Sequence, residues 1–236
     1  MVTEVSHDFV VMKEIAKARA KVYQLLSILY IRPPDAELLK LLSDWIFSIK
    51  SSQELYKLLP KKIVNGLSKI DDYLRNIGKG HDKELIAPLS VEFTRLLRGL
   101  KPSYSPPPPY ESVYRENSDR VFGESTFQVY KEYRHFGLNL ADRFKGEPPD
   151  HISFELNFMS HLCRKEAEAW NKGEYSEGLS LLRVERDFLE QHLIQWVSLL
   201  SKKINSEDKL GFYSAIAELT DGWISFDYEQ ITMQEV

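Results

Sequence analysis

Apolar residues recur at helical spacing along almost the whole of this 236-residue chain. Between Pro34 and Pro60, for instance, they stand at Leu38, Leu42 and Ile46, on one face of a helix. No stretch shows the two-residue alternation of a half-buried strand. Helices are expected at about residues 8–30, 35–49, 52–60, 62–77, 82–100, 125–136, 151–171, 176–203 and 207–220. The pattern predicts an all-α fold, a compact globular multi-helix bundle in which residues 1–236 form a single domain.

Composition is that of a globular chain and argues against several kinds of function. Hydrophobic residues make up 43% and charged residues 28%, which leaves enough apolar side chains for a core. The net charge of −4 argues against a general nucleic-acid binder but leaves a basic peptide partner open. Cys163 is the only cysteine, so no internal disulfide and no thiolate set for zinc or an iron–sulfur cluster is possible. With no signal-like N-terminus and no long apolar run, we expect a soluble, cytoplasmic protein rather than an integral membrane protein.

An irregular region at residues 101–118 interrupts the helices, because its four consecutive prolines, Pro106 to Pro109, cannot be helical. They favour polyproline II or a stiff extended loop. Such a loop can be a spacer, a ligand for a proline-recognition domain, or a rigid arm that holds Tyr110, Glu111 and Tyr114 over a groove. It could also brace the fold or act as a hinge for subunit exchange, so a monomer and a domain-swapped homodimer both stay open.

A second proline stop, Pro148-Pro149, leads directly into an amphipathic helix. Asp150 is expected as the N-cap of that helix, because a carboxylate accepts the amide protons of the first turn. His151 and Glu155 are four residues apart and share one face. Either Asp150 is only a cap and His151 only a solvated residue, or the three residues form an anionic cluster whose imidazole titrates near its usual pKa of about 6.5.

Motifs for catalysis are weak in this chain. It contains no GxxxxGK[ST] phosphate loop, no GxGxxG and no GxSxG. His161 and His192 are expected on polar helix faces, and the four tryptophans are expected in the core. The residues therefore predict a protein that is not an enzyme and that holds neither a metal nor a cofactor.

One enzymatic alternative is a di-metal carboxylate site in a helical bundle. Two segments match Glu-x-x-His, and two further glutamates could complete the ligand set. The residues concerned are Glu4, His7, Glu132, His135, Glu155 and Glu190. Matches this short arise readily by chance in a Glu-rich chain, and the first of them lies at a chain end that is expected to fray.

Four blocks of sequence occur in an order that is more specific than any one of them. The blocks are Glu92–Gly99, Pro108–Tyr114, Pro149–Leu156 and Phe188–Trp196. Together they resemble the ordered motifs of the TorD/DmsD family of cytoplasmic redox-enzyme maturation chaperones. The resemblance implies an all-helical chaperone that binds the twin-arginine signal peptide of a molybdopterin oxidoreductase subunit. It also implies assistance with cofactor insertion into the apo form of that subunit, with its maturation and with export proofreading.

The resemblance also implies which residues bind the signal peptide. They are an aromatic and two apolar residues on one helix, a Pro-aromatic pair in the loop and an Asp-His pair, here Phe93, Leu96, Leu97, Pro109, Tyr110, Asp150 and His151. A leader with two guanidinium groups before an apolar run needs carboxylates beside an aromatic groove, to which Glu111, Glu155 and Tyr114 could contribute. The sequence has Phe93 and Tyr110 where the family commonly has tryptophan, and Leu97 where it commonly has phenylalanine. The spacing of Phe93 and Leu96 fits core packing equally well.

Overall fold

Helices make up the fold, and the computed structural model describes it for residues 2–77, 82–99, 105–116 and 121–234. These ranges contain no strand, which confirms the predicted all-α fold. The helices are α1 (Val2–Ile31), α2 (Ala36–Ser51), α3 (Gln53–Leu58), α4 (Lys61–Ile77), α5 (Asp82–Leu97), α6 (Glu111–Arg115), α7 (Glu124–His135), α8 (Ile152–Lys172), α9 (Tyr175–Phe188), α10 (Ile194–Glu207) and α11 (Phe212–Gln234). A 3-10 turn lies at Asp142–Phe144 and a π-helical turn at Leu189–Leu193. No helix in the described ranges is long and apolar enough to cross a bilayer.

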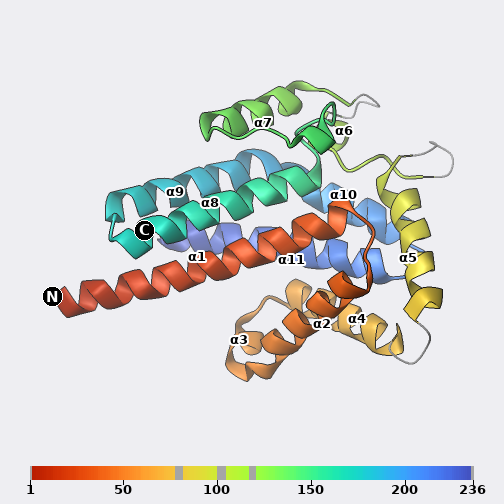
Figure 1. The fold of residues 1–236 in the computed structure, drawn as a ribbon, viewed down its shortest axis with the longest axis horizontal. Helices are drawn as coiled ribbons and strands as arrows, with labels where there is room; N and C mark the ends of the chain where they lie inside the picture. Colours follow the sequence, from red (N-terminus) through yellow and green to blue (C-terminus); the bar gives the residue numbers. More distant parts are fainter. Residues whose placement is uncertain (1, 78–81, 100–104, 117–120, 235–236) are drawn as a thin grey trace.

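The longest helices pack lengthwise at the centre of the molecule (Figure 1). α1 lies along α8, α8 along α9, and α10 along α11, while α4 packs on α11. α2, α3 and α4 gather on one side of this centre, and α6 and α7 lie on the other. The first half of α8 is enclosed on nearly every face, since all of residues 152–160 except Asn157 are buried. The apolar stripes that the spacing predicts are thus covered by neighbouring helices.

A buried arginine links four of the central helices. Arg19 of α1 donates hydrogen bonds to Glu166 of α8 at 2.8 Å and to Glu185 of α9 at 2.5 Å. It also donates to Asp227 of α11 at 2.6 Å, and the Tyr23 hydroxyl donates to the same carboxylate at 2.6 Å. Because a buried charge without partners is very costly, these bonds constrain how the four helices align.

Several helix boundaries differ from those predicted from sequence. The single helix expected at 176–203 is interrupted by the π-helical turn between α9 and α10. The helix expected at 207–220 is wrong, because α10 continues to Glu207 and α11 runs from Phe212 to Gln234. The reason is local: the Asp208 carboxylate accepts the amide protons of Leu210 and Ser214 at 2.9 and 2.8 Å, which opens the new helix.

The proline region is irregular at residues 106–109, as predicted, but α6 follows immediately within the stretch expected to be a loop. Residues 101–104 and 117–118 of that expected loop lie outside the described residues. The C-terminal end of α5 approaches the prolines at Gly99, whose φ is +58°. A Cβ on Gly99 would stand 3.1 Å from the Pro108 ring, so glycine is needed both for this backbone conformation and for the close approach.

Candidate functional site

The proline loop is joined to the start of α8 by main-chain hydrogen bonds. Tyr110 and His151 form an isolated antiparallel bridge. The Ile152 amide donates to the carbonyl of Pro109 at 3.0 Å, and the Glu111 amide donates to the carbonyl of Asp150 at 2.9 Å. Two of the four sequence blocks, about 40 residues apart in the chain, therefore meet backbone to backbone.

Asp150 caps a helix, but not the one predicted. Its Oδ2 accepts the amide proton of Ser112 at 2.9 Å, in the first turn of α6. The N-cap of α8 is instead His151, whose Nδ1 accepts the Ser153 amide proton at 3.1 Å. The predicted role of Asp150 as N-cap of α8 is wrong because α6 lies against it in the fold, a contact that local sequence does not reveal. Burial raises the pKa of Asp150, against the opposing effect of its hydrogen bonds from Ser112.

His151 is buried and neutral rather than solvated and titrating. Burial, together with the nearby positive charge of Arg98, lowers the pKa of His151 to about 3. Since Nδ1 accepts a hydrogen bond, the ring proton of the neutral imidazole resides on Nε2. The expectation that this side chain titrates near its usual pKa is therefore wrong. The ring stands edge-on to Tyr110, with centroids 5.0 Å apart.

Three carboxyl groups, those of Glu111, Asp150 and Glu155, are completely buried at this junction. Glu111 Oε1 accepts a hydrogen bond from Arg115 at 2.8 Å. Burial, and after it the neighbouring carboxyl groups of Glu111 and Asp150, raise the pKa of Glu155 well above its ordinary value. The raised pKa favours the protonated form of Glu155, the form that repels the neighbouring carboxyl groups least.

Two partners of this cluster come from the fourth sequence block. His192 Nδ1 lies 2.9 Å from Glu111 Oε2, and Trp196 Nε1 donates to Glu155 Oε2 at 3.1 Å. His192 belongs to the π-helical turn, where an extra residue per turn changes the direction of the side chains. The polar-face position expected for His192 is wrong, since its exposed fraction is 2%. His192 was not among the residues predicted to bind a leader, and its position in the fourth block is the sequence signal by which it could have been found.

Phe93, Leu96 and Leu97 lie on the buried side of α5, with exposed fractions of 1 to 3%. The Phe93 ring is 6.1 Å from that of Tyr213 in α11, and the Arg98 guanidinium lies 5.6 Å above it. These three side chains therefore pack in the core. The end of α5 adjoins the proline loop where Gly99 meets Pro108.

Of the ten residues predicted to bind a signal peptide, two are partly exposed, Tyr110 and Tyr114. The Tyr110 hydroxyl donates to Glu147 Oε2 and the Tyr114 hydroxyl to the carbonyl of Pro107, both at 2.9 Å. The others are buried: Phe93, Leu96, Leu97, Pro109, Glu111, Asp150, His151 and Glu155. Most of the predicted residues therefore lie in the interior, and only Tyr110 and Tyr114 reach the surface of the junction.

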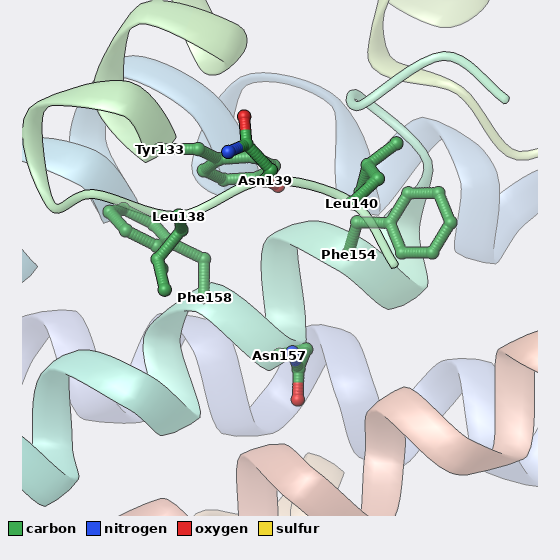
Figure 2. Close-up of a pocket in the computed structure, with 7 residues that line it drawn as sticks. All are labelled: Tyr133, Leu138, Asn139, Leu140, Phe154, Asn157 and Phe158. Atoms are coloured by element: carbon green, nitrogen blue, oxygen red, sulfur yellow. The ribbon is translucent and has the colours of Figure 1, made fainter. Parts of the chain in front are cut away.

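A cavity of about 90 Å³ opens beside the junction, between α7, α8 and the segment that connects them (Figure 2). Its lining is largely aromatic and aliphatic: Tyr133, Leu138, Asn139, Leu140, Phe154, Asn157 and Phe158. The Tyr133 hydroxyl donates to the carbonyl of Pro149 at 3.1 Å, which ties α7 to the start of α8. Beyond ordinary apolar spacing, no sequence signal pointed to this cavity.

The residues proposed for a di-metal enzyme do not converge. His135 and Glu190 are exposed, whereas Glu155 is completely buried. The side chains of Glu4 and His7 lie outside those that the structure describes. The di-metal alternative therefore has no support in this geometry.

Among the described side chains, Cys163, Glu166 and Glu185 are the one group of metal-ligand type whose ligand atoms lie within 4.8 Å of one another. The guanidinium of Arg19 bonds to both glutamates at 2.8 and 2.5 Å. A cationic side chain therefore already occupies the place next to both glutamates, and we interpret the group as part of a structural ion cluster.

The chain resembles known proteins over most of its length. A protein-family model described as nitrate reductase delta subunit matches residues 58–201. A chaperone protein TorD of Shewanella sp. (strain ANA-3) is 29% identical, over 92% of this chain and 96% of the relative. One from Vibrio cholerae is 28% identical, over 92% and 93%. A perchlorate reductase assembly chaperone protein of Dechloromonas aromatica is 28% identical, over 97% of both chains.

Proposed function

The chain belongs to the nitrate reductase delta subunit family, the family of TorD-type chaperones, and from this we propose that it is a cytoplasmic, non-catalytic chaperone of redox-enzyme maturation. In this proposal it binds the twin-arginine leader of a molybdopterin-dependent oxidoreductase subunit. It holds the apo subunit until its cofactor has been inserted, and it delays export until then. Two of the relatives are a TorD chaperone and a perchlorate reductase assembly chaperone, and both support this role.

The observation that carries the proposal is the meeting of the four sequence blocks. The proline loop is bonded to the start of α8, and the π-helical turn supplies His192 to Glu111. The block on α5 reaches the same loop through the contact between Gly99 and Pro108. Sequence blocks that resemble family motifs and lie far apart in the chain thus assemble at one place.

The side chains at the junction of the proline loop and α8 suit a twin-arginine leader. Two guanidinium groups need acceptors, and the apolar run that follows needs an apolar surface. Glu147 is an exposed carboxylate beside the half-buried ring of Tyr110. We propose that Tyr110, Tyr114 and Glu147 contact the leader, while the eight buried residues of the predicted set hold these three in position.

Calorimetric titration tests the proposal. Synthetic leaders from the molybdoenzymes of the source organism should bind, and binding should weaken as salt rises, because part of the contact is ionic. The matched control is the same leader with its arginine pair changed to glutamine, which should bind more weakly. If the folded protein binds none of these leaders, the proposal is contradicted.

A further inference from the structure

A continuous row of aromatic rings leads away from the partly exposed surface of the junction. The Tyr110 ring lies 5.0 Å from that of His151, and His151 lies 5.5 Å from Phe154. Phe154 in turn lies 5.1 Å from Phe144, in the segment before α8. Phe154 also lines the cavity of Figure 2. The buried rings of His151 and Phe154 thus connect Tyr110, on the surface proposed to bind the leader, with the cavity.

The walls of the cavity are apolar, and amides stand at its edge. Figure 2 shows Leu138 beside Phe158 and Leu140 beside Phe154, so that the 138–140 segment and α8 face each other with apolar side chains. Asn157 is the one exposed residue in the first turns of α8, and Asn139 is exposed in the connecting segment. Asn139 Oδ1 already accepts a hydrogen bond from Arg134 at 2.7 Å, which leaves the NH₂ group of Asn139 to donate to a peptide carbonyl.

The volume of the cavity limits which chemical groups can fit into it. An engineered cavity of about 150 Å³ accommodates a benzene molecule, so a volume of about 90 Å³ is suited to one aliphatic side chain and is too small for a nucleotide or a helix. Burial of one leucine or isoleucine side chain strengthens binding about ten- to a hundredfold. One well-placed apolar residue of a peptide could therefore supply a large part of its affinity.

We propose that this cavity receives one aliphatic side chain from the apolar run of the leader, while an arginine of the preceding pair pairs with Glu147. Glu147 accepts from the Tyr110 hydroxyl at one end of the row of rings, and the cavity lies at the other end. This inference rests on the proposed function and adds the position at which the apolar residue is recognised.

A substitution that fills the cavity gives the first test. Leu140 is half-buried in the connecting segment, and Leu140→Trp should occupy the space and weaken leader binding about tenfold or more. The matched control is Leu41→Trp on α2, a leucine that is 53% exposed, which should bind as the parent does. Unchanged affinity in a folded Leu140→Trp overturns the cavity proposal and leaves the proposed function intact. A parent protein that binds no leader overturns both.

Crosslinking gives a second test that needs no change in the protein. A leader carrying photo-leucine at one apolar position at a time is irradiated with the parent protein, and the attachment site is mapped by mass spectrometry. At one position, the label should attach within residues 138–140 or 154–158. Attachment only elsewhere, by a leader that binds, overturns the proposal.

Discussion

The side chain and the main-chain carbonyl of Asp150 hold α6 against the start of α8. The side chain accepts from the Ser112 amide and the carbonyl from the Glu111 amide, both at 2.9 Å. Both acceptors are buried, so loss of the side chain leaves an amide without a partner in an apolar surrounding. The residue is therefore a structural link, and we expect it to influence leader binding only through the position of α6.

Asp150→Ala is expected to lower the free energy of unfolding by about 1 to 3 kcal/mol, because the Ser112 amide loses its acceptor. Asp150→Asn retains an acceptor oxygen and should cost less than Asp150→Ala. Urea unfolding measures both variants, and calorimetry should give Asp150→Asn the leader affinity of the parent. Equal losses of stability in the two variants would show that the hydrogen bond from the Ser112 amide does not account for the stabilising effect of Asp150.

His151 predicts how stability changes in acid. Its pKa is about 3 in the folded protein, and about 6.5 in an unfolded chain, so the folded state favours the neutral imidazole. The stability that this supplies is fully present above pH 6.5 and is lost as pH falls towards 3, at up to about 1.4 kcal/mol per pH unit. His151→Gln should make this acid limb shallower when unfolding is followed between pH 3 and 4.5, below the range in which Glu185 opposes it. An unchanged slope would contradict the burial of a neutral ring.

At the scale of elements, helical spacing was sufficient to predict most of the helices, because an apolar stripe is a property of the local chain. It did not predict α6, a five-residue helix whose first turn depends on Asp150 from a distant segment. Nor did it predict the π-helical turn, since the apolar pattern continues through it from α9 into α10. Burial of the candidate residues could not be read from spacing either, because core and groove residues share the same period.

The proline run makes a prediction at this scale. Pro109 is buried and its carbonyl accepts from Ile152, whereas Pro107 is exposed. Pro107→Ser should cost about 0.4 to 1 kcal/mol of stability, through the greater freedom of the unfolded chain. Pro109→Ser should cost more, because packing is lost as well, and it should weaken leader binding. Equal effects in the two variants, measured by urea unfolding and calorimetry, would mean that the run acts only as a spacer.

At the scale of the whole molecule, the buried apolar cluster includes residues from α1 to α11, and we propose that residues 1–236 fold as one domain. The ion cluster around Arg19 joins four of these helices and places three carboxylates around one guanidinium. The carboxylates exceed the cation in number. Burial raises the pKa of Glu185 to about 8, although Arg19 opposes this shift.

The raised pKa of Glu185 predicts a decline in stability on the alkaline side. A carboxyl group that ionises near pH 4.5 when unfolded and near 8 when folded stabilises the protein fully below about 4.5, and this contribution is lost as pH rises to 8. Glu185→Gln should therefore flatten the dependence of the unfolding free energy on pH between 7 and 8, above the range in which His151 contributes a slope. The exposed Glu190→Gln is the control and should retain the slope of the parent. A Glu185→Gln slope equal to that of the parent would contradict this ionisation.

Amide hydrogen–deuterium exchange with and without leader peptide tests most directly whether the junction of the proline loop and α8 is the binding site. Bound leader should slow exchange in residues 105–116 and 138–158, and a leader with its arginine pair changed to glutamine should do so less. Slowed exchange confined to α2 to α4, with residues 105–116 and 138–158 unchanged, would contradict the site proposed for this chaperone.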